Sequence, residues 1–189
     1  RALAIWAHRY SPRVALDPDD PHALLLDVTG CARVFRGESR LARSLLRDLE
    51  RFRMSARAAI APTFACARAL ARHAPESLTI VPPGGEVRAL RPLPVRALGI
   101  DAAIERALAE VGIERIEQLL DLPRAALPAR FGDGLMLRLD RALGHALEPI
   151  EPLRPTDPPH AERLFEGPTT RTDAIELAVR DTLTDLCAQ

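Results

Sequence analysis

Acidic side chains flank a short apolar segment near the start of the sequence, and they are groups that could bind a metal ion. Asp19 and Asp20 precede the segment, and Asp27 lies near its end. A pair of catalytic Mg²⁺ ions needs carboxylate oxygens from at least two side chains held close together. Of the residues between these aspartates, His22 is a poor magnesium ligand and Ala23 is none. Metal-dependent chemistry here would therefore have to rely on Asp19 and Asp20.

Few other side chains in the sequence offer chemistry. All 26 basic residues are arginine, so no lysine amine is available as a Schiff-base former or a tunable base. The three cysteines are odd in number and far apart, which indicates neither a disulfide framework nor a zinc site. We assign no chemistry to His8, His73, His145 and His160. The sequence therefore predicts no metal ion and no cofactor.

The composition is that of a globular protein, with 47% hydrophobic and 28% charged residues. The net charge is zero, but residues 1–80 contain 13 arginines against 8 acids, whereas residues 81–189 contain 13 against 18. No apolar run approaches the ~18 residues of a membrane span, and no signal peptide is recognisable. We therefore expect a cytoplasmic protein.

The elements around the aspartates predict a hairpin followed by alternating helices and strands. Residues 14–16 and 23–28 predict two strands, because they are apolar and are joined by the turn-forming sequence Asp-Pro-Asp-Asp-Pro. Apolar residues at helical spacing predict an amphipathic helix over residues 38–54. A strand at 55–61 and a helix at 64–73 follow. This order is typical of a ferredoxin-like α+β domain.

The second half of the sequence predicts mostly helices. Residues 75–98 are rich in proline and predict a short strand and a connector. Short helical segments separated by glycine or proline follow at residues 101–111, 114–121, 124–130 and 133–143. Residues 148–159 have the proline content of an extended linker, and residues 171–187 predict a further helix. We expect a small helical domain between the α+β domain and the linker.

Five segments of the chain carry a family signature when they are taken in order. They are LDVTGCARVF at residues 26–35, AIAPTFACARAL at 59–70, LRPLPVRALGI at 90–100, VGIERIEQLLDLP at 111–123 and ARFGDGLMLRLDRALG at 129–144. In this order they resemble segments of the Y-family translesion DNA polymerases. The resemblance implies a partial palm over residues 1–90, with a ferredoxin-like sheet covered by helices on one face and without the fingers and the first palm strand. It further implies a helix-hairpin-helix thumb over 91–146, a proline-rich linker over 147–160 and the start of an α/β little finger over 161–189.

The positions of the catalytic acidic pair of this family carry no acid in this chain. Counting back from the LDVTG motif at residues 26–30, these positions fall on His22 and Ala23. Asp27 alone cannot replace a pair, and it is more typical of a turn residue that orders the end of a strand. The two aspartates of the preceding turn remain as displaced substitutes, although an alignment that moved them would break the match. The resemblance therefore implies an inactive palm.

The nucleotide-binding segment of the family is also altered. Thr63 and Phe64 follow Pro62, where active members have asparagine and lysine. The lysine that would meet the triphosphate is thus replaced by an aromatic residue. Arg68 stands where the family often has a second lysine, so a contact with phosphate could survive there. We therefore describe this segment as a degenerate nucleotide site.

The thumb turn predicts weak binding of DNA. Its residues are Gly99, Ile100 and Asp101, with an acid where the family has a small residue. A carboxylate that faces a DNA phosphate is repulsive. From Glu86 to Arg141 the chain has nine arginines and nine acids, so no electropositive footprint remains. Gly99 and Ala102 stay as weak candidates for contact with DNA.

Arginines recur along the predicted 38–54 helix and just before it. They are Arg36, Arg40, Arg43, Arg47 and Arg51. Such a run is usually a solvated face, but it is also a candidate surface for a protein partner. In a palm of this family the helices cover the sheet face opposite the active site, so the stripe is expected to point away from nucleic acid.

Within the family, the chain most resembles the ImuB subgroup, whose members have lost polymerase activity. This resemblance implies a non-catalytic scaffold or adaptor for error-prone translesion synthesis in damage-induced mutagenesis. The implied partners are an ImuA-like protein, an error-prone DnaE-type polymerase and the sliding clamp, with a clamp-binding peptide beyond Gln189. The resemblance also implies association with the nucleoid during DNA damage.

Two other functions stay open. An active translesion polymerase with displaced carboxylates would extend a primer with magnesium or manganese. A plain helix-hairpin-helix module would bind duplex DNA through residues 90–145 with a steep dependence on salt. The balanced charge of that region argues against the second alternative.

Overall fold

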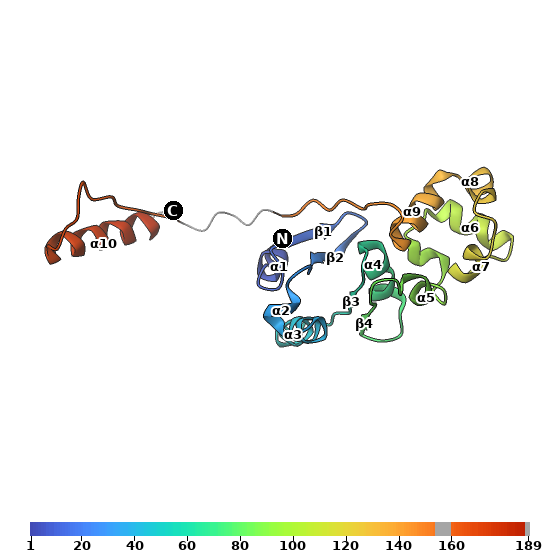
Figure 1. The fold of residues 1–189 in the computed structure, drawn as a ribbon, viewed down its shortest axis with the longest axis horizontal. Coiled ribbons are helices and arrows are strands. Elements are labelled where there is room, and N and C mark those ends of the chain that lie inside the picture. Colours follow the sequence, from blue (N-terminus) through green and yellow to red (C-terminus); the bar gives the residue numbers. More distant parts are fainter. Residues whose placement is uncertain (154–159, 188–189) are drawn as a thin grey trace. The chain divides into compact units, whose positions relative to one another are not determined.

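The computed structural model describes residues 1–153 and 160–187, and the chain divides into two compact units. Unit 1 comprises Arg1–Leu153 and unit 2 comprises Arg154–Gln189. The division falls within the proline-rich linker predicted over 147–160, of which residues 154–159 lie outside the described residues. Unit 1 contains both sheets of the described structure, which confirms the α+β class (Figure 1).

The predicted hairpin is confirmed and carries an irregularity. Strands β1 (Arg13–Asp17) and β2 (Asp20–Asp27) are antiparallel and pair from Arg13 opposite Asp27 to Leu16 opposite Leu24. The register then shifts, so that Asp17 lies opposite Asp20. Residues 21–23 have no partner on β1 and form a bulge, a feature that re-aims side chains locally. Strand β2 thus begins three residues earlier than the sequence predicts.

Helices α1 to α3 pack around the hairpin and the second sheet. Helix α1 (Ala2–Ala7) buries Ala4 and Ala7 against Val14 of β1, and α2 (Ala32–Phe35) leads into α3 (Glu38–Arg51). The predicted amphipathic helix is therefore confirmed, and it packs against the second sheet. Its apolar face buries Leu41, Ala42 and Leu49, whereas its arginines are exposed.

The second sheet is a parallel pair connected by a helix. Strands β3 (Ala58–Ile60) and β4 (Leu78–Ile80) pair in register, and α4 (Phe64–His73) connects them. The described strands thus form two separate two-stranded sheets rather than one continuous sheet. Thr63 caps α4, because its hydroxyl accepts a hydrogen bond from the backbone N–H of Cys66.

The helical region forms one core together with α4. Its helices are α5 (Glu86–Leu90), the 3₁₀ helix η1 (Val95–Leu98), α6 (Ala102–Glu110), α7 (Ile116–Leu120), α8 (Ala126–Phe131) and α9 (Asp133–Leu143). Helices α6 to α9 agree with the predicted segments, whereas α5 and η1 lie in the predicted connector. Leu90, Leu108, Leu119 and Leu135 are fully buried in the same cluster as Cys66 of α4. The hydrophobic core therefore crosses the predicted boundary between palm and thumb at residue 90.

Unit 2 contains the predicted C-terminal helix. Helix α10 (Thr172–Cys187) exposes several large apolar residues, and its Asp185 pairs with Arg163. Between His160 and Arg171 the chain forms neither helix nor strand. Within the residues that the structure describes, no helix is both long and apolar enough to cross a membrane.

Candidate functional site

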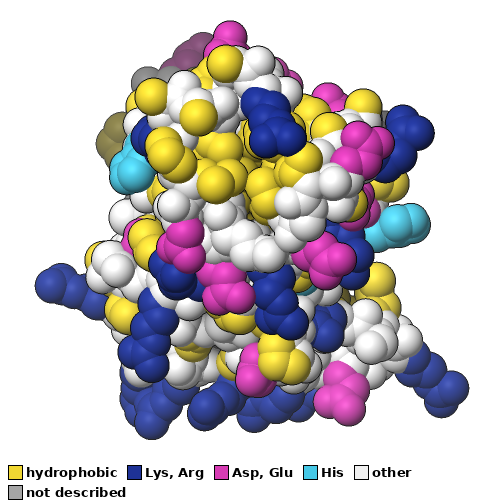
Figure 2. Space-filling view, turned by 90° about the vertical axis from the view of Figure 1, so that its right-hand side faces the viewer, with side chains coloured by type: hydrophobic (Ala, Val, Ile, Leu, Met, Phe, Trp, Pro, Cys, Tyr) yellow, Lys and Arg dark blue, Asp and Glu magenta, His cyan; other side chains and the backbone are white. Residues whose placement is uncertain are grey.

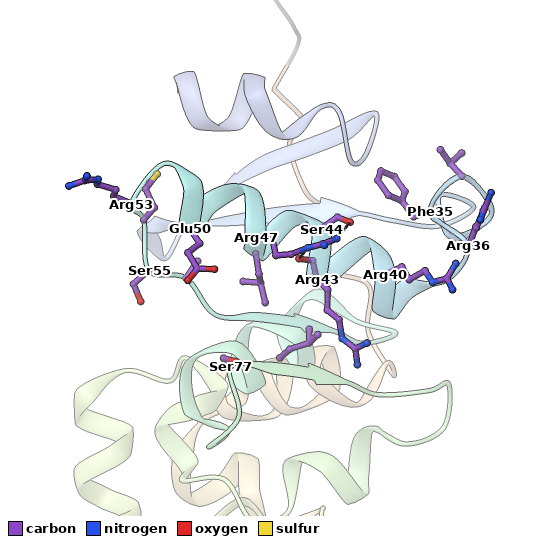
Figure 3. A pocket seen from close by; sticks show the side chains of 15 residues that line it. Phe35, Arg36, Arg40, Arg43, Ser44, Arg47, Glu50, Arg53, Ser55 and Ser77 are labelled. Atoms are coloured by element: carbon purple, nitrogen blue, oxygen red, sulfur yellow. Dashed lines mark hydrogen bonds between the residues drawn. The ribbon is translucent and has the colours of Figure 1, made fainter.

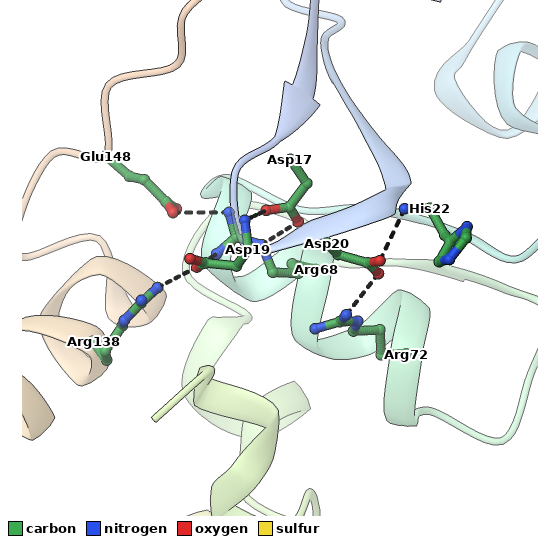
Figure 4. A network of polar contacts seen from close by, with 8 residues as sticks. All are labelled: Asp17, Asp19, Asp20, His22, Arg68, Arg72, Arg138 and Glu148. Atoms are coloured by element: carbon green, nitrogen blue, oxygen red, sulfur yellow. Dashed lines mark hydrogen bonds and ion pairs between the residues drawn. The ribbon is translucent and has the colours of Figure 1, made fainter. Parts of the chain in front are cut away.

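His22 and Ala23 lie in the bulge of β2, next to the turn of the hairpin. The side chain of His22 is exposed and that of Ala23 is half-buried. The backbone N–H of His22 donates a hydrogen bond to Oδ1 of Asp20, at 2.9 Å. The carboxylate of Asp20, at the start of β2, therefore holds the backbone of the bulge at His22 (Figure 4).

Asp20 is held by an arginine of α4. Nη2 of Arg72 donates to Oδ2 of Asp20 at 2.6 Å. The pKa of Asp20 is lowered, first by the hydrogen bond from the backbone of His22 and then by the bond from Arg72. Both oxygens of this carboxylate thus accept hydrogen bonds from the protein itself.

Asp19 is held by an arginine of α9. Nη1 of Arg138 donates to Oδ2 of Asp19 at 2.6 Å, and Arg68 lies further away, with 3.9 Å between its Nη1 and the same oxygen. The hydrogen bond from Arg138 lowers the pKa of Asp19 more strongly than desolvation raises it. Asp19 therefore joins the hairpin to the helical region (Figure 4).

Arg68 is buried beside the turn, with only 5% of its side chain exposed. Its Nε donates to Asp17 at 2.6 Å and its Nη2 donates to Glu148 at 2.9 Å. Burial by itself would lower the pKa of Arg68, but the charges of Glu148 and Asp17 outweigh it and raise the pKa. A phosphate could bind Arg68 only by displacing these carboxylates, whose side chains are 0% (Asp17) and 12% (Glu148) exposed.

The acids around the hairpin turn are thus paired with arginines, although four carboxylates face three guanidinium groups. Four carboxylates, those of Asp17, Asp19, Asp20 and Glu148, face the guanidinium groups of Arg68, Arg72 and Arg138. A divalent cation would compete with these guanidinium groups for the carboxylates, of which Oε2 of Glu148 is buried without a hydrogen-bond partner within the described residues. Across residues 1–153 and 160–187, no group of three or more His, Cys, Asp or Glu side chains is placed to hold a metal ion.

Asp27 at the far end of β2 orders the turn that follows. Its Oδ1 accepts a hydrogen bond from the backbone N–H of Thr29 at 3.1 Å, and its Oδ2 accepts one from Arg13 at 3.1 Å. Hydrogen bonding to Thr29 lowers its pKa, and Arg13 acts in the same direction. The predicted role of Asp27 in ordering the strand end is confirmed.

The residues of the predicted nucleotide segment have structural contacts in this chain. Thr63 caps α4, and its hydroxyl also donates to the backbone carbonyl of Ala142 at 3.1 Å, at the end of α9. Phe64 is the first residue of α4 and is half-buried. Thr63 thereby connects α4 to α9, which packs beside it.

The predicted thumb turn precedes α6. Gly99 has a φ of 69° in the left-handed region, where glycine is favoured, and Ala102 is exposed as the first residue of α6. Asp101 occupies the N-cap position but forms no capping hydrogen bond. On the side of the molecule that carries α6 to α8, basic, acidic and apolar side chains are mixed, which agrees with the balanced charge count (Figure 2).

The arginine stripe divides into two parts. Arg36, at the C-terminal end of α2, lines a groove along α3 together with Arg40, Arg43 and Arg47. Arg51 lies outside this groove and pairs with Asp48 one turn earlier, at 2.9 Å. The predicted candidate surface is therefore a groove to which four of the five arginines contribute.

Sequence reasoning did not identify the arginine network around the turn. The contacts from Asp17 and Glu148 to Arg68 span 51 and 80 residues, and the contact from Asp19 to Arg138 spans 119. No local spacing signals such pairs, because each joins elements that are brought together only by the tertiary fold. The abundance of arginine was visible, but the individual partners were not.

Comparison with known proteins finds an ImuB protein and a DNA polymerase IV that are similar in sequence to the chain. Over 188 residues the chain is 42% identical to the protein ImuB of Caulobacter vibrioides, and the match covers 100% of this chain and 40% of that protein. DNA polymerase IV of Halobacterium salinarum is 34% identical over 118 residues, which cover 61% of this chain and 29% of that protein. No protein-family model matches the chain. The chain therefore spans well under half the length of these relatives.

Solved structures show the same fold. The crystal structure of DinB from Sulfolobus solfataricus superposes with a TM-score of 0.64 at 22% identity, over 80% of this chain and 45% of that chain. The insertion ternary complex of Dbh DNA polymerase gives a TM-score of 0.61, also at 22% identity, over 77% of this chain and 43% of that chain.

Proposed function

The chain is an ImuB homologue with the fold of the Y-family DNA polymerases, and we propose that it acts as a non-catalytic, polymerase-like scaffold in error-prone translesion DNA synthesis. The protein to which it belongs would serve damage-induced mutagenesis. It would bring other proteins to damaged DNA rather than incorporate nucleotides itself.

One observation carries this proposal. At the two positions where active members of the family have acidic residues, this chain has His22 and Ala23, within a bulge beside the hairpin turn. Nucleotidyl transfer uses two divalent cations that activate the attacking oxygen and stabilise the leaving group. An imidazole and a methyl group do not supply the hard oxygen ligands that such ions require.

The arrangement of the neighbouring acids supports the same conclusion. Asp19 and Asp20 are the displaced substitutes that an active polymerase would need, and both accept hydrogen bonds from arginines at 2.6 Å. A metal ion would compete with Arg72 and Arg138 for these carboxylates. This competition supports an inactive palm over the rival active polymerase, although both arginines are partly exposed and each pair contributes only about 0.5–1 kcal/mol.

The partners follow from homology alone and complete the proposal. We propose an ImuA-like protein, an error-prone DnaE-type polymerase and the sliding clamp as partners, and association with the nucleoid during DNA damage. Contact with DNA through Gly99 and Ala102 would be weak, because Asp101 stands between them and the surrounding charges are balanced.

Primer extension by the full-length protein tests the proposal. We expect no incorporation on a primed template with magnesium or manganese, under conditions in which an active DinB-type polymerase extends the primer. Size-exclusion chromatography with the DnaE-type polymerase and the sliding clamp tests the scaffold role, and co-elution is expected.

Two variants identify the source of any activity that is seen. Asp19→Ala/Asp20→Ala removes the displaced carboxylates, whereas Glu110→Ala/Glu114→Ala removes two exposed acids of the helical region. Extension that disappears only in the first variant would establish the rival polymerase. Extension that persists in both variants would be assigned to a contaminating enzyme only if mass spectrometry identified that enzyme in the preparation.

A further inference from the structure

A groove runs along α3 on the described surface of unit 1. It is bounded by residues 34–36 at the end of α2, by one face of α3, by residues 53–56 and by Ser77 and Leu78 at the start of β4. Its volume is about 1100 Å³. Figure 3 shows side chains from α3 extending over the strands beside it.

The groove is strongly basic. Its charged residues are Arg36, Arg40, Arg43, Arg47, Arg53 and Glu50, five arginines against one acid. Within the described residues, none of these six forms an ion pair, whereas Arg51 just outside pairs with Asp48. Arg47 bonds only to the hydroxyl of Ser44 and the carbonyl of Arg43. Asp48 interacts with the charge of Arg47, but Arg36, Arg40, Arg43 and Arg53 form no ion pair within the described residues.

Two of these arginines have an unusual backbone. Arg36 and Arg53 both have a φ of 57°, and they are the non-glycine residues with positive φ in the described part of the chain. They follow the C-terminal ends of α2 and α3, at opposite ends of the groove, where glycine would be the favoured residue. Arginine at both positions places a cation at each end of the groove, at a conformational cost that glycine would avoid (Figure 3).

The groove also offers apolar contacts. Val34 is 81% exposed and Met54 is 43% exposed, although both are large apolar side chains. Phe35, Leu46 and Leu78 are partly buried and line the same groove. Apolar side chains interspersed with arginine are typical of surfaces that bind proteins.

We propose that this groove binds an acidic, amphipathic peptide segment of a partner protein, an inference that rests on the scaffold function proposed above. Carboxylates of the segment would pair with Arg40, Arg43 and Arg47, and its apolar residues would cover Val34 and Met54. We choose an acidic segment because its charge is complementary to that of the groove, and because guanidinium groups can bind carboxylates through two hydrogen bonds.

Nucleic acid fits the groove less well than an acidic peptide. Single strands bind where bases stack on free aromatic faces. One face of Phe35 is already covered by the ring of Tyr10, with 5.6 Å between centroids and an interplanar angle of 23°. Glu50, which lies in the groove between Arg47 and Arg53, repels an acidic peptide and a phosphate backbone alike, so the covered face of Phe35 is what disfavours a nucleic-acid strand (Figure 3).

Fluorescence anisotropy with the full-length protein tests this proposal. The probe is a fluorescein-labelled peptide of repeated Asp-Leu-Glu-Phe units, and the comparison probes are an Asn-Leu-Gln-Phe peptide and a labelled oligo(dT) strand. We expect the acidic peptide to bind the wild-type protein more tightly than the neutral peptide. Arg40→Glu/Arg43→Glu should weaken its binding by about tenfold or more, because two charge-assisted contacts become repulsive.

The matched control is Arg88→Glu/Arg106→Glu, which makes the same change in net charge at exposed positions outside the groove. It should leave the affinity for the acidic peptide within about twofold, since distant surface charges are screened. Circular dichroism confirms that both variants remain folded.

Several results would overturn the proposal. They are an acidic peptide that does not bind, equal affinities for the two peptides, an equal loss in both variants, or a loss of oligo(dT) binding alone in Arg40→Glu/Arg43→Glu. None of these readouts measures nucleotide incorporation. The peptide-binding proposal can therefore fail while the non-catalytic assignment holds. Primer extension tests that assignment separately.

Discussion

Arg138 of α9 donates a hydrogen bond to the carboxylate of Asp19 in the hairpin turn, with 2.6 Å between Nη1 and Oδ2. The two residues are 119 positions apart. Arg138 also lies beside the turn that precedes α6, because a Cβ built on Gly99 would be 3.7 Å from its Nη1. One arginine thus contacts the turn of the hairpin and approaches the turn that precedes α6.

The pair between Asp19 and Arg138 should stabilise the fold by a modest amount. The two side chains are 37% and 29% exposed, so solvent screens the attraction. We expect Asp19→Ala and Arg138→Ala each to lower the free energy of unfolding by about 0.5–1 kcal/mol. Chemical denaturation of both variants and of the double variant measures the coupling. Fully additive losses would show that the two side chains do not interact in solution.

Arg68 should be far more important for stability than an exposed arginine. Arg68→Met leaves the buried carboxylate of Asp17 without its charged partner, and this should cost about 3–5 kcal/mol. Arg88→Ala is the control, because Arg88 is exposed, and it should change stability by less than about 0.5 kcal/mol. Thermal and urea unfolding monitor both. Similar losses of stability in the two variants would contradict the conclusion that Arg68 is a buried partner of Asp17.

The network should make folding sensitive to acid. The pKa values of Asp19 and Asp20 are lower in the folded protein than their ordinary value of 3.8. Their contribution to stability is therefore present above pH 3.8 and is lost as the pH falls through the lowered values. The free energy of unfolding of Asp19→Asn/Asp20→Asn should fall less steeply than that of the wild type below about pH 4. If the free energies of unfolding of the two proteins fell equally steeply with decreasing pH, the lowered pKa values would be contradicted.

Tyr10 should lose its proton at a higher pH than an ordinary tyrosine does. Burial, followed by a hydrogen bond from its hydroxyl to Asp48, raises its pKa from 10.0 to about 12. Its neutral form therefore stabilises the fold fully below pH 10.0, and that contribution is lost as the pH rises through about 12. Tyr10 is the one tyrosine of this chain, so the ultraviolet absorbance of tyrosinate in the isolated chain follows it directly. In Asp48→Ala its midpoint should move towards 10.0, and an unchanged midpoint would contradict the contact.

Local patterns in the sequence were sufficient to predict most helices and strands of unit 1. Helix α3 was predictable because Leu41, Leu45 and Leu49 repeat at helical spacing, and the hairpin because a proline-rich turn separates two apolar runs. The bulge at residues 21–23 was not predictable, since it depends on Asp17 pairing with Asp20 across the turn. The sequence motifs also located His22 and Ala23, but motif spacing says nothing of the arginines around them.

The groove along α3 illustrates the same limit. The stripe of arginines was visible in the sequence, yet Arg53 and Met54 enter the groove only because the chain reverses after α3 and brings β3 alongside. Arg51, which belongs to the same stripe, lies outside the groove and pairs with Asp48. The contribution of each arginine thus depends on tertiary packing that no local spacing encodes.

Manganese binding to the full-length protein tests most directly whether the palm can hold catalytic metal. Electron paramagnetic resonance of free Mn²⁺, titrated with wild-type protein and with Asp19→Asn/Asp20→Asn, counts the ions bound at the hairpin turn. We predict no difference between the two proteins, because guanidinium groups occupy these carboxylates and His22 and Ala23 supply none. Saturable binding to the wild type that is lost in the double variant would contradict the non-catalytic assignment.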